Sequence, residues 1–185
     1  MREVVYMNIT IRYNDENDKF SNDLNLEMRL QRYIIDNFYL AYILSNLAPI
    51  YLVGGTIRDL ILAKEPKDMD FFILGTEYSN LIINILESYN IELTRNKFNG
   101  YKFIYQNTEI DLWFTEDLFS AMQYNVDGLY FDLRFNKLVS LTFEHFIKNG
   151  LQLINSENNI PGDRIKKLKK FETLYLGNRK NEVIK

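Results

Sequence analysis

The sequence predicts an α/β or α+β domain in which helices flank a mixed β-sheet, followed by a short C-terminal helical extension. Short apolar stretches rich in β-branched and aromatic residues alternate with stretches of helical periodicity, which is typical of helices packed on a sheet. The 185 residues, 46% of them hydrophobic, suffice for one domain with its own core. We expect the domain to occupy residues 1–162 and the extension to occupy residues 163–185.

The first half of the chain combines alternating and helical patterns around a pair of glycines. Apolar residues recur at helical spacing from Leu26 to Leu47, which predicts one long helix. In chain order, we expect a strand or hairpin arm over residues 4–13, that helix over 26–47, a strand over 51–53, a helix over about 57–62, a strand from about Met69, and a helix that runs from an N-cap at Ser79 to about Tyr89.

The second half contains more strands, separated by Asn and Gly turns. We expect strands over 91–94, 101–105 and 109–114, turns at 99–100 and 106–108, a short helix-like segment over 118–124, a hairpin of strands 129–132 and 137–140, a helix over 143–149 ended by Gly150, and a basic helix over 164–175. Strands interleaved with helices in this order favour a mixed sheet.

Composition excludes several classes of protein. The chain has no cysteine, which excludes a disulfide framework, thiol catalysis and a cysteine zinc site. No apolar run approaches the length of a membrane span, and the N-terminus lacks the apolar block of a signal peptide. We therefore expect a cytoplasmic protein without a membrane partner.

Residues 51–74, YLVGGTIRDLILAKEPKDMDFFIL, carry the chemistry. Gly54 and Gly55 allow a tight turn and let a phosphate approach the backbone, and the helix behind them points free N–H groups at the same place. Asp68 and Asp70 are two residues apart on an extended segment, so their carboxylates share a face. Hard oxygen ligands of this kind suit Mg²⁺ that carries substrate phosphates, which is the equipment for phosphoryl or nucleotidyl transfer.

This segment resembles the head-domain signature of the tRNA CCA-adding nucleotidyltransferases and bacterial poly(A) polymerases, within the DNA polymerase beta superfamily. The family pattern is LVGG-x-x-RD-x-L-L-G, a short loop and D-x-D. The chain matches it at Leu52, Val53, Gly54, Gly55, Arg58, Asp59, Leu62, Asp68 and Asp70, and departs from it at Ala63, where the family usually has glycine. The resemblance implies a nucleotidyltransferase fold, two Mg²⁺ ions and an NTP substrate, ATP or CTP.

The resemblance also implies a third metal-binding carboxylate on a later strand. Asp111, in the segment EIDLWF, lies where that acid should be, and Glu109 on the same face is the alternative. In this scheme Asp68, Asp70 and Asp111 are the catalytic metal ligands. The expected nucleotide-binding residues are Gly54, Gly55, Arg58, Asp59, Asn125, Lys166 and Lys169. Arg58 could instead brace the turn by pairing with an acid, and Asp59 could be a structural partner of the helix start.

Outside residues 51–74 the likeness is looser, and it extends over roughly residues 45–172. The family has an Arg-Asp pair before a Thr-x-Asn-Ala stretch; here Asn125 aligns with that asparagine, and the Arg-Asp pair is absent. The segment PGDRIKKLKKF resembles the helix that opens the family's neck domain, with Asp163 matching and Lys166 and Lys169 at arginine positions. We therefore expect a head domain followed by a remnant of the neck.

The acceptor of the transferred nucleotide stays open at this point. The net charge is −3, yet residues 164–185 hold eight Lys or Arg residues against two Glu, so an acidic body carries a basic tail. Such a tail can contact RNA, which favours an RNA 3′ end, tRNA included, as the acceptor. A protein or small-molecule acceptor is the alternative, and a non-catalytic relative that binds nucleotide or RNA is the third reading.

Overall fold

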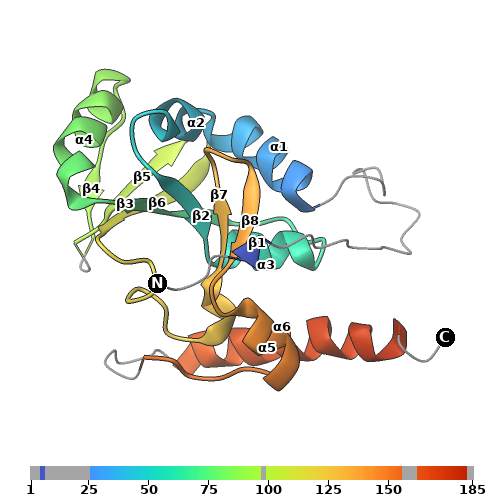
Figure 1. Ribbon diagram of the computed structural model, residues 1–185. Coiled ribbons are helices and arrows are strands. Elements are labelled where there is room, and N and C mark those ends of the chain that lie inside the picture. The colour runs from blue at the N-terminus through green and yellow to red at the C-terminus, as the bar shows by residue number, and fades with distance from the viewer. Residues whose placement is uncertain (1–4, 7–25, 97–98, 156–161, 183–185) are drawn as a thin grey trace.

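The structure is a computed structural model that describes residues 5–6, 26–96, 99–155 and 162–182. An eight-stranded mixed sheet lies at its centre, with the strand order β1-β8-β7-β2-β3-β6-β5-β4 (Figure 1). β3 and β6 pair in parallel and the other neighbours pair antiparallel. The strands are β1 (Val5–Tyr6), β2 (Ile50–Val53), β3 (Asp68–Leu74), β4 (Thr94–Arg95), β5 (Tyr101–Tyr105), β6 (Thr108–Thr115), β7 (Leu129–Asp132) and β8 (Lys137–Ser140).

Helices flank this sheet, so the predicted fold class is confirmed. The α-helices are α1 (Leu26–Phe38), α2 (Leu40–Ser45), α3 (Gly55–Ile61), α4 (Ser79–Ser88), α5 (Phe143–Asn149) and α6 (Gly162–Glu182), and the 3₁₀ turns are η1 (Thr76–Tyr78) and η2 (Asn125–Gly128). No helix among the described residues is both long enough and apolar enough to cross a membrane.

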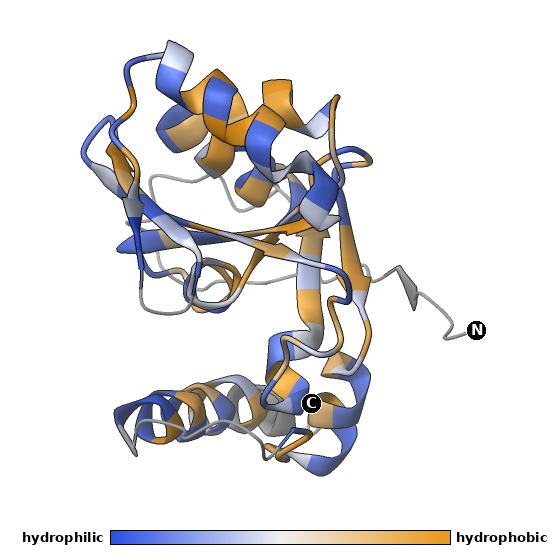
Figure 2. Cartoon of the chain, turned by 90° about the vertical axis from the view of Figure 1, so that its left-hand side faces the viewer, coloured by the Kyte–Doolittle hydropathy of each residue, from blue (hydrophilic) through white to orange (hydrophobic). Residues whose placement is uncertain are grey.

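The main hydrophobic core lies between one face of the sheet and the helices α1 to α4 (Figure 2). On β3, Met69, Phe71 and Ile73 are completely buried in this core, while the residues between them point to the other face. The same alternation on β6 buries Ile110 and Leu112 and turns Asp111 away from the core. The period of the strands thus places apolar side chains on the core face and acids on the opposite face.

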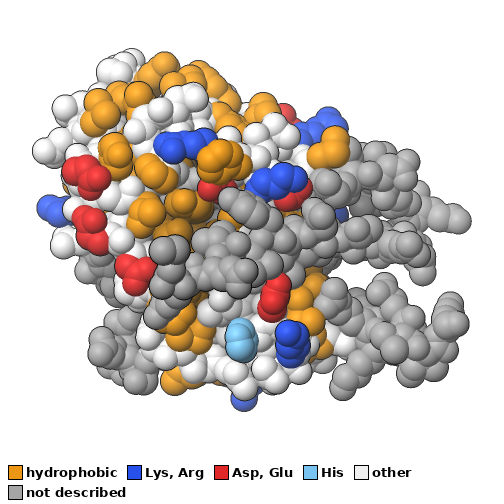
Figure 3. Space-filling view, in the orientation of Figure 1, with side chains coloured by type: hydrophobic (Ala, Val, Ile, Leu, Met, Phe, Trp, Pro, Cys, Tyr) orange, Lys and Arg blue, Asp and Glu red, His pale blue; other side chains and the backbone are white. Residues whose placement is uncertain are grey.

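The outer surface of the body is unusually apolar in places. Large hydrophobic side chains remain exposed at Ile35 of α1, at Tyr39 between the two helices and at Ile43 of α2, and Leu47 follows just beyond α2. Figure 3 shows hydrophobic side chains gathered over the upper part of the molecule, with charged side chains scattered between them.

Helices α5 and α6 form a second layer below the sheet (Figure 1). Stacked rings hold them together: Phe171 and Tyr175 of α6 lie 5.4 Å apart at 9°, and Phe146 of α5 lies 5.7 Å from Phe171 at 26°. Over the part of α6 whose side chains are described, Leu168, Phe171 and Tyr175 are the buried residues, and they share one side of the helix. Packing of this buried side orients α6 and places Lys166, Lys167, Lys169 and Lys170 on its exposed faces.

Most expected elements are confirmed, and several are exact: the strands 101–105, 129–132 and 137–140 and the helix 143–149. The expected long helix over 26–47 is wrong, because the chain breaks near Tyr39 into α1 and α2. The Asn37 side-chain amide donates to the Tyr33 backbone carbonyl at 2.9 Å. The Tyr42 backbone amide donates to the Tyr39 carbonyl, only three residues back, at 3.0 Å. The expected arm over 4–13 is described only at β1.

Three other expectations need correction. Ser79 lies inside α4 and caps nothing, because the turn η1 leads directly into the helix from Tyr78. The strand expected at 91–94 is reduced to Thr94 and Arg95, the two residues that pair with β5. The segment 118–124 contains turns, and the helical turn η2 begins only at Asn125.

Two glycines offer a test of this packing. A Cβ on Gly128 would collide with the Thr142 hydroxyl and lie 2.9 Å from both the Thr142 backbone nitrogen and the Met122 sulfur, whereas a Cβ on Gly177 of α6 would meet nothing within 4 Å. We expect Gly128→Ala to lower the free energy of unfolding by about 1–3 kcal/mol through overpacking. Gly177→Ala should raise it by up to about 1 kcal/mol through helix propensity. Urea unfolding measures both, and equal effects would contradict the packing around η2.

Candidate active site

Three carboxylates lie on the face of the sheet that points away from the main core. The parallel pairing of β3 and β6 places Asp70 in register with Asp111, and Asp68 in register with Glu109. Because residues in register on adjacent strands project to the same face, Asp68, Asp70 and Asp111 form a group. The structure therefore places on one face of the sheet the three acids that the sequence predicts as catalytic residues.

The glycine turn between β2 and α3 lies directly against this group. Gly54 has φ of +76°, a region that favours glycine, and a Cβ there would lie 2.8 Å from the Asp70 Oδ2. A Cβ on Gly55 would lie 4.0 Å from the Asp68 Oδ1, which is ordinary contact. The Thr56 hydroxyl donates to the Asp68 carbonyl at 2.7 Å and fastens the start of α3 to β3. Of the two glycines, only Gly54 must be glycine, because both its backbone conformation and the nearby Asp70 carboxylate disfavour a Cβ.

Ala63 explains another part of the motif. Its φ is +52°, in the left-handed region, just after α3 ends. This is the position at which the resembled family usually has glycine, and glycine adopts this conformation without the cost that a Cβ adds, about 1 kcal/mol. Alanine in place of glycine at position 63 therefore adds local strain but leaves the turn after α3 in place.

The negative charge of Asp70 is strongly disfavoured by its surroundings. Burial, followed by repulsion from Asp68 and Asp111, raises the pKa of Asp70 to about 7, and the positive charges of Arg58 and Arg164 only partly oppose this. A carboxyl group in this position is stabilised either by a proton or by a cation. The site thus favours cation binding at Asp70.

Asp111 already has protein partners. Lys102 is its cross-strand neighbour on β5, and the Lys102 Nζ lies 3.3 Å from the Asp111 Oδ2 and 2.6 Å from the Glu109 Oε1. The Asn96 amide donates to the Asp111 Oδ1 at 3.4 Å. Both oxygens of Asp111 are therefore engaged by side chains of the hairpin that precedes it.

These contacts decide how well a metal ion fits. Within the described ranges, no three His, Cys, Asp or Glu side chains converge in a metal-binding arrangement. Asp68 and Asp70 make no hydrogen bond or ion pair through their carboxylates in those ranges, and as a repelling pair they fit a divalent cation. Asp111 can join them only if the Lys102 ammonium moves aside.

Asp127, which lies outside the glycine–aspartate motif and carries no signal in the sequence, organises the arginines of the site. Asp127 of η2 accepts from the Arg58 Nη1 at 3.2 Å through Oδ1 and from the Arg164 Nη2 at 3.0 Å through Oδ2. The same Oδ2 accepts from the Tyr124 backbone amide at 3.0 Å. Arg58 thus pairs with an acid, one of the two roles foreseen for it, and the partner lies 69 positions away in the chain.

The remaining predicted residues fall into different places. Asn125 is buried, and its side-chain amide bonds the Gly150 carbonyl at 2.8 Å and the Gln152 amide at 2.9 Å, which anchors the chain after α5. Asp59 has its pKa raised by burial, an effect opposed by Lys64 and Arg58. Lys166 is largely exposed and lies 3.7 Å from Asp163; Lys169 is exposed as well. Their contacts with nucleotide stay predictions.

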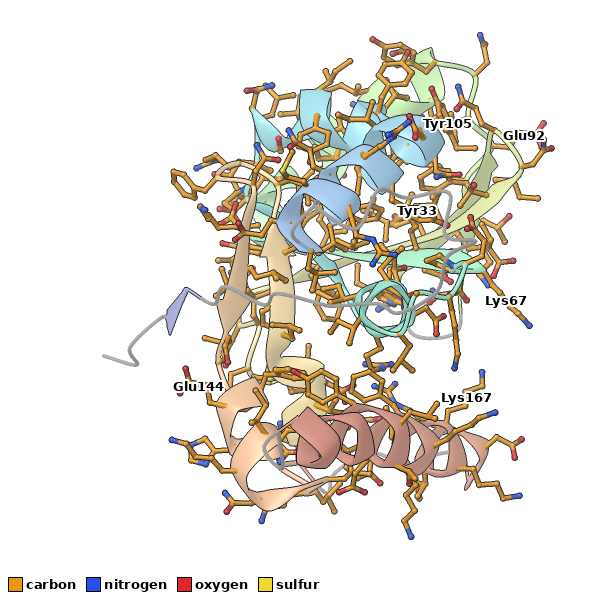
Figure 4. The ribbon with its side chains drawn as sticks, turned by 90° about the vertical axis from the view of Figure 1, so that its right-hand side faces the viewer. Tyr33, Lys67, Glu92, Tyr105, Glu144 and Lys167 are labelled. Atoms are coloured by element: carbon orange, nitrogen blue, oxygen red, sulfur yellow. The ribbon has the colours of Figure 1, made fainter. Side chains whose placement is uncertain are left out.

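The basic helix α6 presents part of its charge to the body of the protein. In Figure 4, Lys167 lies on the side of α6 that faces the sheet and α3. Its charge helps to lower the pKa of Asp59 on α3, against the larger effect of burial, so the two side chains are within electrostatic range. Together with Arg164, Lys167 brings positive charge from α6 towards the carboxylates.

Comparison with known proteins agrees with this arrangement. Residues 50–118 match the family model described as the Poly A polymerase head domain. Among solved structures, a CCA-adding enzyme in complex with CTP superposes with a TM-score of 0.51 and 19% identity over 70% of this chain and 36% of that chain. The first apo form of a CCA-adding enzyme gives 0.51 and 19%, over 70% and 35%. A second apo form of a tRNA-processing enzyme gives 0.50 and 16%, over 63% and 37%.

No curated protein gives a significant match to the chain. At these identities the structural likeness shows a shared fold, and the chain spans only about a third of the length of the matched structures. The family-model match includes the motif segment, and the structural matches show the fold. Residues 50–118 are therefore similar to the Poly A polymerase head domain, and the described fold is shared with the CCA-adding enzymes.

The raised pKa of Asp70 predicts a pH dependence of stability in the metal-free protein. The folded protein holds the Asp70 proton up to a pH of about 7, whereas the unfolded chain releases it near pH 4. The free energy of unfolding should therefore fall as the pH rises between these values. Asp70→Asn should flatten this slope and raise the stability at pH 8 by about 1–4 kcal/mol. Denaturant titrations measure it, with exposed Asp36→Asn as the control; equal slopes in wild type and Asp70→Asn would contradict the assignment.

Lys102 predicts a second measurable effect. Because its ammonium competes with any divalent cation for Asp111, Lys102→Met should tighten Mn²⁺ or Mg²⁺ binding in the absence of nucleotide by about tenfold, or roughly 1.4 kcal/mol. Isothermal calorimetry measures it. Lys137→Met is the matched control, since Lys137 is a strand lysine that pairs with Glu27 at 3.2 Å. Unchanged or weaker binding in Lys102→Met would show that Lys102 does not block the site.

Proposed function

Because residues 50–118 match the Poly A polymerase head domain, we propose that the protein is a nucleotidyltransferase. It would transfer NMP from an NTP to an RNA 3′-hydroxyl, with a tRNA end as the first acceptor to test. The observation that carries the proposal is the group of Asp68, Asp70 and Asp111 beside the Gly54 turn. A phosphate can approach the backbone at that turn because no side chain stands between it and the carboxylates.

The proposed reaction needs no side-chain nucleophile. The acceptor oxygen forms a bond to the α-phosphorus, the bond from that phosphorus to the bridging oxygen of the β-phosphate breaks, pyrophosphate leaves and the hydroxyl proton is released. Asp68 and Asp70, joined by Asp111 once Lys102 withdraws, would hold Mg²⁺. When bound, two such ions supply charge neutralisation on the triphosphate and a more acidic acceptor hydroxyl.

The chain's own residues contribute binding and orientation. Arg58 and Arg164 place guanidinium groups near Asp70, where the negative charge of a triphosphate would lie. Thr56 keeps the glycine turn fixed against β3. CTP and ATP are the nucleotides to test, and CTP is supported by the matched CCA-adding enzyme that was solved with it.

The acceptor is proposed from the C-terminal extension, residues 163–185. The aromatic side of α6 packs against α5. Lys166, Lys167, Lys169 and Lys170 are all exposed, and Lys167 lies on the side of α6 that faces the body. An RNA strand that follows this helix would reach the carboxylates from the side of Lys167. In this proposal residues 1–162 are the catalytic head and the extension guides the acceptor.

A second candidate function is supported by one contact. Because both oxygens of Asp111 are engaged by Lys102 and Asn96, the protein could bind nucleotide or RNA without transferring it. Incubation with labelled ATP or CTP, with and without an RNA pool, separates the candidates. Label in RNA supports the proposed function, label in the protein alone supports a protein acceptor, and nucleotide binding without transfer supports the non-catalytic relative.

The carboxylate pair gives the sharpest activity prediction. Asp70→Asn should lower the rate of transfer by more than about a hundredfold, the scale seen when a group that stabilises transition-state charge is removed. The measurement is label incorporated per minute at saturating NTP. Asp132→Asn is the control, because Asp132 is a buried strand carboxylate whose hydrogen-bond partners among the described residues are the backbone amides of Arg134 and Phe135 in its own turn. Wild-type turnover in Asp70→Asn would refute the assigned site.

The lysines of α6 predict a salt dependence. If they contact RNA phosphates, replacing Lys166, Lys167, Lys169 and Lys170 by Gln should weaken RNA binding strongly at low salt and much less at high salt. Each lost contact should reduce the log–log salt slope by roughly one unit or slightly less. Filter binding over a range of KCl concentrations measures the slope, with the exposed Lys148→Gln on α5 as the control. A wild-type protein without salt-dependent RNA binding would rule out the RNA acceptor.

A further inference from the structure

We infer that Asp127 is a positioning residue that joins Arg58 of α3 and Arg164 of α6 into a single phosphate-binding pair, and that Arg164 is a nucleotide contact supplied by the C-terminal helix. The inference deepens the proposed function and rests on it for the identity of the phosphate. Neither Asp127 nor Arg164 belongs to the motif that defines the head domain.

The first support is the way in which Asp127 is held. Its side chain is only 8% exposed, and three donors from separate parts of the chain converge on it: the two arginines and the Tyr124 amide. The bond from Tyr124 closes a capping box on η2, so the carboxylate is held by its own backbone independently of the arginines. A carboxylate fixed by its own backbone can orient the two longer, more flexible side chains.

The second support is that each arginine contacts Asp127 through one terminal nitrogen. Arg58 uses Nη1 and Arg164 uses Nη2, so neither pair is the bidentate arrangement that would use two nitrogens of the fork. Among the described residues neither guanidinium has another hydrogen-bond partner, and the Arg164 Nε is buried without one. Buried N–H groups of this kind normally have an acceptor, and a bound phosphate would supply it.

The third support is the balance of charge. Two guanidinium groups share one carboxylate, which leaves one positive charge in a largely buried cluster. Both arginines also lie close enough to Asp70 to lower its pKa against the stronger effect of burial, so the cluster borders the proposed metal carboxylates. Once a divalent cation neutralises Asp68 and Asp70, the surplus positive charge is available to an anion.

The arrangement makes the nucleotide site depend on the C-terminal helix. Arg58 follows the glycine turn directly, whereas Arg164 stands in the first turn of α6, and Asp127 is their common partner. The stacked rings of Phe146, Phe171 and Tyr175 anchor the helix that carries Arg164, independently of its contact with Asp127.

Inorganic tripolyphosphate with Mg²⁺ is the probe, because it carries the phosphates of an NTP and neither base nor sugar. Calorimetry should show that Arg164→Met and Asp127→Asn each weaken its binding by about tenfold or more, the value of one charge-assisted hydrogen bond. The double variant should be no weaker than the weaker single variant, because Arg164 acts only when Asp127 positions it. Asp132→Asn, which alters an equally buried carboxylate away from the arginines, should bind like the wild type.

Arg164→Met keeps the proposal testable if Asp127→Asn fails to fold, since the Arg164 side chain is 41% exposed. In transfer assays Arg164→Met should raise the KM for NTP more than it lowers kcat, which a merely structural defect would not do. Wild-type tripolyphosphate affinity in a folded Arg164→Met, additive losses in the double variant, or no tripolyphosphate binding by the wild type would each overturn the inference. If the binding pattern holds and no NMP is transferred to any acceptor, the inference stands and the proposed function fails.

Discussion

The parallel pairing of β3 with β6 is the constraint on which the rest of the site depends. It sets Asp70 beside Asp111 in a fixed register. The antiparallel neighbours complete the arrangement. Val53 at the end of β2 pairs with Asp70, so the chain turns at Gly54 over that carboxylate. On the other side, Lys102 of β5 pairs with Asp111. Because side chains alternate along strands, a slip of one residue in β6 would send Asp111 into the hydrophobic core.

Such a group of acids is costly to the folded protein, and the opposite face of the same strands supports it. Met69, Phe71 and Ile110 are completely buried, and their packing against the helices holds the strands in register while the carboxylates repel one another. The protein thus keeps a destabilising arrangement where function needs it and compensates through the core on the other side of the sheet. Lys102, Arg58 and Arg164 reduce the repulsion further.

The motif, its strand–turn–helix–strand context and the later hairpins could be predicted, because each rests on residues close together in sequence. The role of Asp127 could not, since its bond to Arg164 spans 37 positions and depends on how α6 packs. Lys102 carried a usable signal: a two-residue turn at Gln106 and Asn107 sets the register of β5 and β6 and puts Lys102 opposite Asp111. The break at Tyr39 could not be predicted either, because the apolar spacing continues through it.

The position of Trp113 gives the site its own optical reporter. It is the one tryptophan of the sequence, two residues beyond Asp111 on the same face of β6, with its indole edge against Gly100 and its ring 5.8 Å from Phe72. Phe72 in turn is two residues beyond Asp70 on β3. All indole emission from this molecule therefore originates beside the carboxylates, and occupation of the site can be followed in the unlabelled protein by ultraviolet fluorescence, without a dye or an introduced chromophore.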